Sequence, residues 1–165
     1  NIFTSKMFSE AILQRRCLVL CSGFFEWRTF KGKKYPYYIT LKNDQLFAFG
    51  GIYNQQVDKY SGELMITYSI LTVEANSLMA QIHNSKKRMP LILPPEEAKL
   101  WLDKTQDVRG INTLMKPMGE GILKAHSVKK FVPSESTANN VPQISAYYNY
   151  PELTGLMDDI DLFKT

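Results

Sequence analysis

Short runs rich in aromatic and β-branched residues dominate this chain, and turn-forming residues separate them from one another. Such runs are typical of β-strands. The regular alternation of strands and helices that builds a parallel sheet is absent. We therefore predict an α+β fold with a mostly antiparallel, barrel-like β-sheet and a few flanking helices. The predicted strands cover residues 17–27, 35–41, 46–53, 64–73 and 123–128.

Other stretches of the chain favour short helices, because their apolar residues recur at helical spacing or follow a proline that suits a first turn. These stretches begin at about residue 5 or 9 and run to residue 14, and then cover residues 74–83, 94–102 and 108–115. The first ends on the basic pair Arg15 and Arg16, which the helix dipole favours. Within the third strand, Gly50 and Gly51 predict a β-bulge, and residues 55–62 are predicted to form a polar loop.

The length of 165 residues fits one domain over residues 1–165, in which residues 143–165 form a loosely held tail. No apolar run approaches the length needed to cross a bilayer, and no secretory signal opens the chain. We expect a cytoplasmic protein that has no membrane partner and acts as a monomer. Twenty basic residues against 16 acidic ones permit contact with a polyanion without demanding it. Residues 28–34 and 86–88 are basic, and basic runs of this kind are usually solvated loops.

The cysteine and histidine content argues against the commonest kind of metal site. Cys17 and Cys21, together with only two histidines, do not make a zinc site. On an extended strand four residues span about 13 Å, which is too far for a disulfide. We expect two core thiols in a reducing cytoplasm, no metal and no other cofactor.

One carboxylate, that of Glu26, stands in the most apolar and aromatic surroundings of the chain, between Phe25 and Trp27. Moving an ionised carboxylate out of water without a partner costs several kcal/mol. Glu26 should therefore pair with a basic side chain or be tuned for proton transfer. Alternation along the strand offers a third interpretation, in which Glu26 points to solvent, and the local sequence alone favours it.

His83 ends a predicted helix and precedes the basic residues Lys86, Lys87 and Arg88. A histidine in such a place is more often a cap or a satisfied core side chain than a catalytic group. Arg88 has an equally plain interpretation as a surface cation. We expect His126, on the late strand, to be structural.

Four blocks of sequence occur in an order that resembles a known family. They are residues 15–27, with Arg-Arg-Cys-Leu-Val and Gly-Phe-Phe-Glu-Trp; 35–39, Tyr-Pro-Tyr-Tyr-Ile; 72–76, Thr-Val-Glu-Ala-Asn; and 82–93, with Ile-His and Arg-Met-Pro-Leu-Ile-Leu. In these blocks the chain is similar to the SOS response-associated peptidase (SRAP) family, which includes bacterial YedK-type abasic-site processing proteins. The family usually has His-x-Arg-Met-Pro, whereas three more residues separate His83 from Arg88 here.

The resemblance implies chemistry on single-stranded DNA that contains abasic sites. An opened abasic sugar exposes an aldehyde, and an N-terminal cysteine offers an amine and a thiol that together close a thiazolidine ring. In the family this cysteine follows an initiator methionine that the protein removes from itself. The resemblance assigns proton transfer to Glu26 and His83. It also implies phosphate contacts by Arg88, Lys33, Lys34, Lys86 and Lys87.

The chain opens on Asn1 rather than on a cysteine, and it lacks the family's Asn-Ala-Arg-Ser-Glu-Thr block. We therefore expect an inactive fragment or processed chain without two of the four active-site elements, in which neither Cys17 nor Cys21 replaces the nucleophile. Two alternatives stay open. One is a module that binds single-stranded nucleic acid without chemistry, through exposed aromatic residues such as Tyr37 or Tyr53. The other is a peptidase that acts on other substrates.

Overall fold

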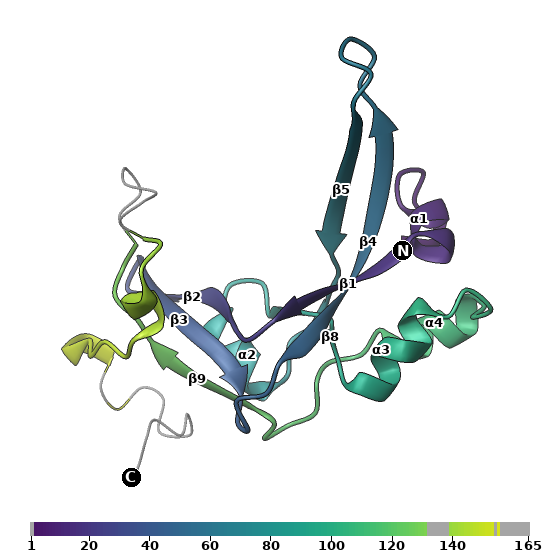
Figure 1. Cartoon of the computed structure of the whole chain (residues 1–165). Helices are drawn as coiled ribbons and strands as arrows, with labels where there is room; N and C mark the ends of the chain where they lie inside the picture. Colours follow the sequence, from purple (N-terminus) through teal and green to yellow (C-terminus); the bar gives the residue numbers. More distant parts are fainter. Residues whose placement is uncertain (1, 132–138, 154, 156–165) are drawn as a thin grey trace. The chain divides into compact units, whose positions relative to one another are not determined.

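A computed structural model describes residues 2–131, 139–153 and 155 of the chain (Figure 1). It contains short helices, a four-stranded sheet in one compact unit and a three-stranded sheet in the other, and the strands of both these sheets pair antiparallel. This confirms the predicted α+β class and the antiparallel pairing. No closed barrel forms within the described residues. No helix in that part of the chain is long and apolar enough to cross a membrane.

Contacts between residues divide the chain into these two units. Unit 1 contains Asn1–Cys21, Phe47–Glu74 and Pro90–Met118. Unit 2 contains Ser22–Leu46, Ala75–Met89 and Gly119–Thr165.

The sheet of unit 1 is built around β4 (Phe47–Val57), which pairs with β1 (Arg16–Cys21), β5 (Leu64–Ile70) and the short β8 (Ile92–Leu93). Helices α1 and α3 contact β1 and β4, so their apolar residues complete a core with the sheet. The other elements of this unit are η1 (Ile2–Thr4), α1 (Ser9–Gln14), β6 (Thr72–Glu74), α3 (Pro95–Leu102) and α4 (Val108–Leu114). Core residues of unit 1 include Ile12, Ile52, Leu91, Trp101 and Ile111.

The predicted bulge at Gly50 and Gly51 is wrong. Both residues continue the regular register with β1, where they lie opposite Leu18 and Cys17. A Cβ atom on Gly50 would lie 2.6 Å from Cδ2 of Leu91, and the Gly50 amide donates a hydrogen bond to the Leu91 carbonyl. Glycine suits this position because the side chains of Leu91 and Leu93 occupy the space that a Cβ atom would need, not because the strand bends.

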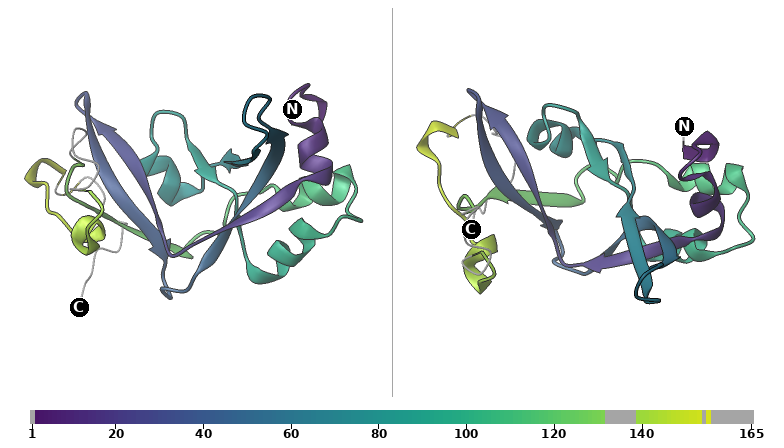
Figure 2. Two further views of the ribbon diagram at one scale, coloured as in Figure 1. Left: turned by 45° about the horizontal axis from the view of Figure 1, so that its top comes forward. Right: turned by 90° about the horizontal axis from the view of Figure 1, so that it is seen from above.

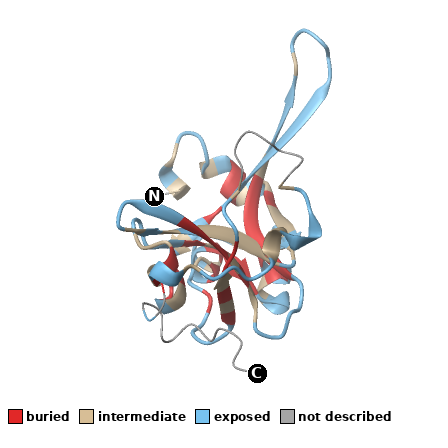
Figure 3. Ribbon diagram, turned by 90° about the vertical axis from the view of Figure 1, so that its left-hand side faces the viewer, coloured by how far each residue is buried: buried red, intermediate tan, exposed pale blue. Residues whose placement is uncertain are grey.

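The loop predicted at residues 55–62 is also partly wrong, because β4 continues to Val57 and forms a long hairpin with β5. Every residue of β5 is exposed, and Figure 3 shows this hairpin in the colour of exposed residues. The predicted strand at residues 64–73 is interrupted at Leu71 and resumes as β6. Apolar residues that alternate with polar ones normally indicate a covered face, but the described residues of unit 1 leave all of β5 exposed.

A buried arginine joins the helices of unit 1 to its sheet. The guanidinium of Arg16 donates hydrogen bonds to the carbonyl oxygens of Ile12, Leu13, Trp101 and Asp103, over 2.6 to 2.8 Å. Burial lowers the pKa of Arg16, and the charge of Asp103 acts in the opposite direction. The four carbonyl groups satisfy the donors of a cation that has left bulk water.

Unit 2 contains the three-stranded sheet β2 (Phe24–Phe30), β3 (Lys33–Leu41) and β9 (Leu123–Ser127), with β3 in the centre. Helix α2 (Ser77–Ile82) lies beside β2, as both views in Figure 2 show. The start of β7 (Arg88–Pro90) also belongs to this unit. Buried residues of unit 2 include Tyr35, Tyr37, Ile39, Met79, Ile82, Met89 and Val128.

The register between β2 and β3 fixes which side chains share a face of this sheet. Glu26 lies opposite Tyr37, and Arg28 lies opposite Tyr35. Because residues directly opposite each other point to the same side, these four residues share one face, which we call the Glu26 face. The other face carries Phe25, Trp27, Tyr38 and His126.

The end of the described chain lies against β9. Two short 3-10 helices, η2 (Pro142–Ser145) and η3 (Pro151–Leu153), flank a segment in which the Tyr148 amide donates to the Ser127 carbonyl. His126 Nε2 lies 2.7 Å from the Ser145 carbonyl oxygen. The tail predicted at residues 143–165 therefore begins in a hydrogen-bonded segment, and residues 154 and 156–165 lie outside the described part of the chain.

Candidate active site

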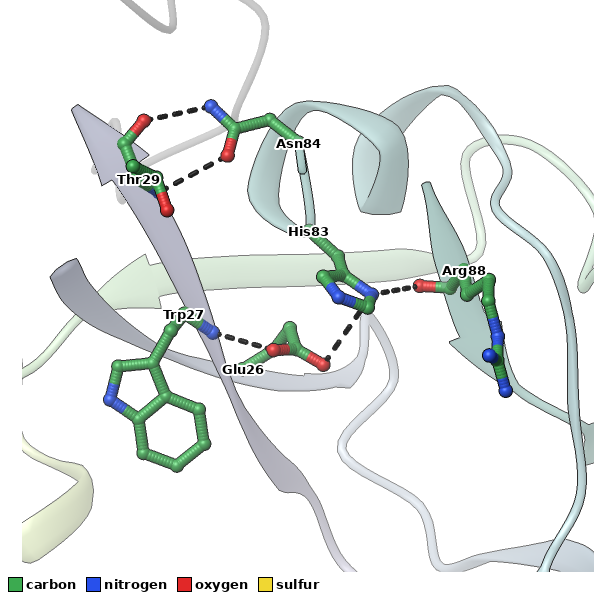
Figure 4. A network of polar contacts seen from close by, with 6 residues as sticks. All are labelled: Glu26, Trp27, Thr29, His83, Asn84 and Arg88. Carbon is green, nitrogen blue, oxygen red and sulfur yellow. Dashed lines mark hydrogen bonds and ion pairs between the residues drawn. The ribbon is translucent and has the colours of Figure 1, made fainter. Parts of the chain in front are cut away.

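Glu26 occupies the middle of β2 and is held by its own strand. Its Oε1 atom accepts a hydrogen bond of 2.8 Å from the backbone amide of Trp27. The side chain is 23% exposed, so it is neither fully buried nor free in solvent. Its second oxygen, Oε2, points toward His83 (Figure 4).

His83 is placed by helix α2, which ends at this residue. The helix begins at the buried Asn76, whose Oδ1 atom accepts from the amide of Met79 over 3.0 Å. Met79 and Ile82 are fully buried and anchor the helix in unit 2. The His83 amide then donates to the Met79 carbonyl, which fixes the backbone from which the imidazole projects.

The hydrogen bond at one ring nitrogen determines what the other can do. Nδ1 of His83 lies 2.8 Å from the carbonyl oxygen of Arg88. Because a carbonyl oxygen can only accept, Nδ1 must carry the hydrogen. Nε2 is therefore the ring atom that remains for exchanging a proton with another group.

The Glu26 carboxylate and the His83 ring form a loose pair. Oε2 of Glu26 lies 3.9 Å from Nδ1 of His83, which is too long for a hydrogen bond. Each side chain is 23% exposed, so the protein shields the pair from part of the surrounding water. Attraction between them requires a charged imidazole, because a neutral ring carries no net charge.

The residues between His83 and Arg88 form a closed turn. The Lys87 amide donates to the His83 carbonyl over 2.8 Å, and Lys87 has a positive φ of 49°. The turn brings the backbone of Arg88 back to the His83 ring. The three additional residues of this chain are therefore accommodated without separating Arg88 from His83. The Arg88 guanidinium points away from the imidazole (Figure 4).

Asn84 fixes this turn to strand β2. Its Nδ2 atom donates to the Thr29 carbonyl over 2.8 Å, and its Oδ1 atom accepts from the Thr29 amide over 3.1 Å. One side chain thus pairs with both backbone groups of Thr29, as Figure 4 shows. Sequence patterns do not predict this role, because asparagine after a helix is usually only a turn residue.

Asn84 also brings the two predicted basic segments together. Lys34 lies opposite Thr29 in the β2–β3 hairpin, so the start of β3 and the turn after His83 share one end of the sheet. The five predicted phosphate-binding residues are all exposed and all belong to unit 2. Lys33 and Lys34 point to opposite faces of the strand, and Lys33 shares the Glu26 face. The five residues are Lys33, Lys34, Lys86, Lys87 and Arg88.

Tyr37 is not an exposed stacking platform, which corrects one prediction. Only 4% of the residue is exposed, on the Glu26 face. Burial raises the pKa of Tyr37, and the positive charge of Arg28 opposes that shift, while Tyr147 and Tyr150 reinforce it. Tyr53, the other predicted platform, is half-buried in unit 1.

Free thiols and metal-ligating clusters are the two other kinds of reactive group that a site of this kind could use. Cys17 and Cys21 are both free thiols on β1, and burial raises the pKa of Cys17. A thiol with a raised pKa is a poor nucleophile. Within the described residues, no group of three or more His, Cys, Asp or Glu side chains is placed to hold a metal ion.

Comparison with known proteins agrees with the sequence blocks quoted above. Residues 1–135 match the family model for SOS response associated peptidase (SRAP). The chain belongs to the SRAP family. The match confirms the resemblance. The matched residues include the strands and helices that carry Glu26, His83 and Arg88.

Several SRAP relatives carry the name abasic site processing protein. YoqW of Bacillus subtilis is 34% identical over 83% of this chain, and HMCES of Gallus gallus is 31% identical over 78%. The aligned region makes up 59% of YoqW and 42% of HMCES, so this chain spans only part of the length of these relatives. A crystal structure of a protein from Bacteroides thetaiotaomicron superposes with a TM-score of 0.83 and 37% identity, covering 90% of this chain and 63% of that one.

Proposed function

We propose that the protein to which this chain belongs processes abasic sites in single-stranded DNA by forming a covalent protein–DNA crosslink. The nucleophile is an N-terminal cysteine, exposed when the protein removes its own initiator methionine. Glu26 and His83 transfer protons in this reaction. The names of the SRAP relatives support the substrate, and the arrangement of Glu26 and His83 supports the chemistry.

The reaction has three steps: ring opening, imine formation and ring closure. The ring of the abasic sugar opens to an aldehyde when a proton reaches the ring oxygen, its bond to the anomeric carbon breaks, and the anomeric hydroxyl gives up its own proton. The cysteine α-amine adds to the aldehyde carbon, and loss of one water gives an imine. The thiol then adds its sulfur to the imine carbon and its proton to the nitrogen, which closes a thiazolidine ring.

One observation carries this proposal: the His83 ring is held by a backbone carbonyl at Nδ1, with Nε2 left for proton exchange, and the Glu26 carboxylate lies beside it. In the proposed reaction, His83 protonates the sugar ring oxygen. Glu26 shuttles protons during imine formation and reversal through its Oε2 atom, since Oε1 accepts from the Trp27 amide and Oε2 lies 3.9 Å from the His83 ring. Groups held in place by the backbone lose little entropy when they act.

Exposed cations at the same end of the sheet support binding of the DNA strand. Lys86, Lys87 and Arg88 follow His83, and the hairpin with Lys33 and Lys34 lies next to their turn. Cations of this kind bind phosphates without reading bases. Affinity for single-stranded DNA should therefore fall steeply with salt and depend little on sequence. Salt-independent binding, or binding to duplex alone, would contradict this part of the proposal.

The test is the intact mass of the protein produced with its natural N-terminal sequence, after incubation with an abasic single-stranded oligonucleotide. A heat-stable mass increase equal to the oligonucleotide less one water supports the crosslink. An unchanged mass, with binding retained, favours a module that binds without chemistry. The mass of the protein alone reports whether the initiator methionine has been removed.

The role of Glu26 is tested in the same protein by Glu26→Gln. The amide oxygen can still accept from Trp27, so the fold should persist, while crosslink formation or reversal should slow by about 100-fold. The control is Glu74→Gln, which changes an exposed strand glutamate in the same way. Equal kinetics in the two variants would remove Glu26 from the mechanism.

The 165-residue chain itself should form no stable crosslink, because it has no cysteine with a free α-amine. Asn1 could give only a labile imine through its own amine. A heat-stable adduct of this chain would identify Cys17 or Cys21 as a nucleophile and would overturn this account of the reaction.

A further inference from the structure

Arg28 has buried donors that the protein does not satisfy. Its Nε and Nη1 atoms are shielded from solvent, and neither has a hydrogen-bond partner. They are the two such atoms found in the side chains of the described residues. A buried donor without an acceptor costs free energy, and most native proteins avoid one unless a ligand or water supplies the acceptor.

The contrast with Arg16 shows that this chain does satisfy a buried guanidinium elsewhere. Four backbone carbonyls accept from Arg16. The Nε and Nη1 atoms of Arg28 have no such acceptor, and the ion pairs found among the described residues do not include Arg28. Within the described part of the chain, the partly buried charge of Arg28 therefore has no paired anion.

Arg28 stands beside the candidate catalytic pair. It follows Glu26 by two positions on β2 and shares its face, so the two side chains are neighbours on the sheet. Its charge acts on the buried hydroxyl of Tyr37, which lies opposite Glu26. Lys33 adds a second cation to this face. Hydrogen bonds from the Glu152 backbone and from the Tyr35 hydroxyl lower the pKa of the Glu152 carboxyl, and the positive charge of Lys33 lowers it further.

We propose that Arg28 binds a phosphate group of the single strand next to the Glu26–His83 pair. A phosphate supplies both the missing negative charge and several acceptor oxygens, and arginine is the side chain best suited to it. The inference rests on the proposed function for the identity of the strand. It assigns to Arg28 a positioning role: the guanidinium fixes the backbone so that the sugar lies at Glu26.

The anion site is tested first without DNA, by thermal unfolding of the 165-residue chain in sodium phosphate and in sodium chloride of equal ionic strength. Phosphate should raise the Tm of the wild type, because a ligand that binds the folded state stabilises it. Arg28→Gln should lose that increase. The control Arg109→Gln removes an exposed charge from α4 and should keep it. A wild-type Tm that does not respond to phosphate overturns the site.

The source of the phosphate is tested with abasic single-stranded oligonucleotides in which one linkage at a time is a neutral methylphosphonate. In the wild type, replacing one particular linkage near the abasic site should weaken binding about tenfold, which is the effect of losing a hydrogen bond to a charged group. In Arg28→Gln the same linkage should have no effect, and the slope of log affinity against log salt should fall by about 0.7. Arg109→Gln should behave as the wild type.

The possible outcomes separate this inference from the proposed function. If the wild type binds the strand but no linkage loses its effect in Arg28→Gln, the inference is wrong and the function stands. If the wild type binds no strand but keeps its response to phosphate, the function fails and Arg28 holds free phosphate instead. Should Arg28→Gln not fold, Arg28→Lys serves in its place, since lysine keeps the charge but loses the arginine donors at the buried positions.

Discussion

Replacing Asn84 with alanine would remove both hydrogen bonds that hold the His83 turn on β2. The bonds to the Thr29 amide and carbonyl are 3.1 and 2.8 Å long and lie in exposed surroundings. A typical hydrogen bond contributes about 0.5 to 1.5 kcal/mol, and exposed ones fall at the lower end, so the pair should contribute about 1 kcal/mol. For a chain of this size that corresponds to a fall in Tm of about 2 to 4 °C.

A second variant separates the two bonds. Asn84→Asp can still accept from the Thr29 amide, but it cannot donate to the carbonyl, and its charge repels that oxygen. It should be no more stable than Asn84→Ala. The control is Asn43→Ala, because Asn43 also makes two exposed hydrogen bonds, but only to the neighbouring Gln45 in a turn.

Calorimetry or thermal unfolding followed by circular dichroism measures the three variants, and hydrogen exchange of the Lys87 amide reports on the turn itself. Exchange should become faster in Asn84→Ala, because the turn is no longer tied to the strand. The reasoning is refuted if Asn84→Ala and the wild type have the same Tm and the same exchange rate. It is also refuted if Asn43→Ala is as destabilised as Asn84→Ala.

Two other predictions follow from single contacts. The neutral imidazole of His83 should be the tautomer with hydrogen on Nδ1, because that atom lies 2.8 Å from a carbonyl oxygen; nitrogen NMR of the labelled protein would contradict this if Nε2 carried the hydrogen. Gly50→Ala should destabilise the protein by about 1 to 3 kcal/mol, because the new methyl group would lie 2.6 Å from Leu91 in a filled core. Gly119→Ala, whose methyl group would meet only the end of Ile122 at 3.2 Å, should cost less in the same denaturant titration.

Residue patterns predict where the strands and helices of this fold lie better than they predict what packs against each element. The strands and the short helices lie close to their predicted positions, because turn residues and periodicity act locally. The length of the β4–β5 hairpin and the role of Gly50 could not be predicted in that way. Both depend on which segments pack against β4, and the packing of Leu91 on Gly50 joins positions far apart in the chain.

The candidate site shows the same division. Resemblance to the SRAP family predicts Glu26 and His83 as site residues, whereas the local sequence favours a solvent-facing glutamate and a capping histidine. Sequence patterns predict no site role for Arg28 or Asn84, because both residues stand in stretches that resemble ordinary basic or polar loops. Their significance comes from partners: Thr29 for Asn84, and the absence of any described acceptor for the buried donors of Arg28.

The closed turn after His83 affects how proteins of this kind are recognised from sequence. The Lys87 amide and the His83 carbonyl close the turn, and the ring then meets the carbonyl of Arg88 although residues 84–87 lie between them. A search pattern with one fixed residue between the histidine and Arg-Met-Pro would reject this chain. We expect this turn to be a place where insertions accumulate in the family without altering the imidazole, so that a pattern anchored on Arg-Met-Pro with a variable gap would find members that a rigid one misses.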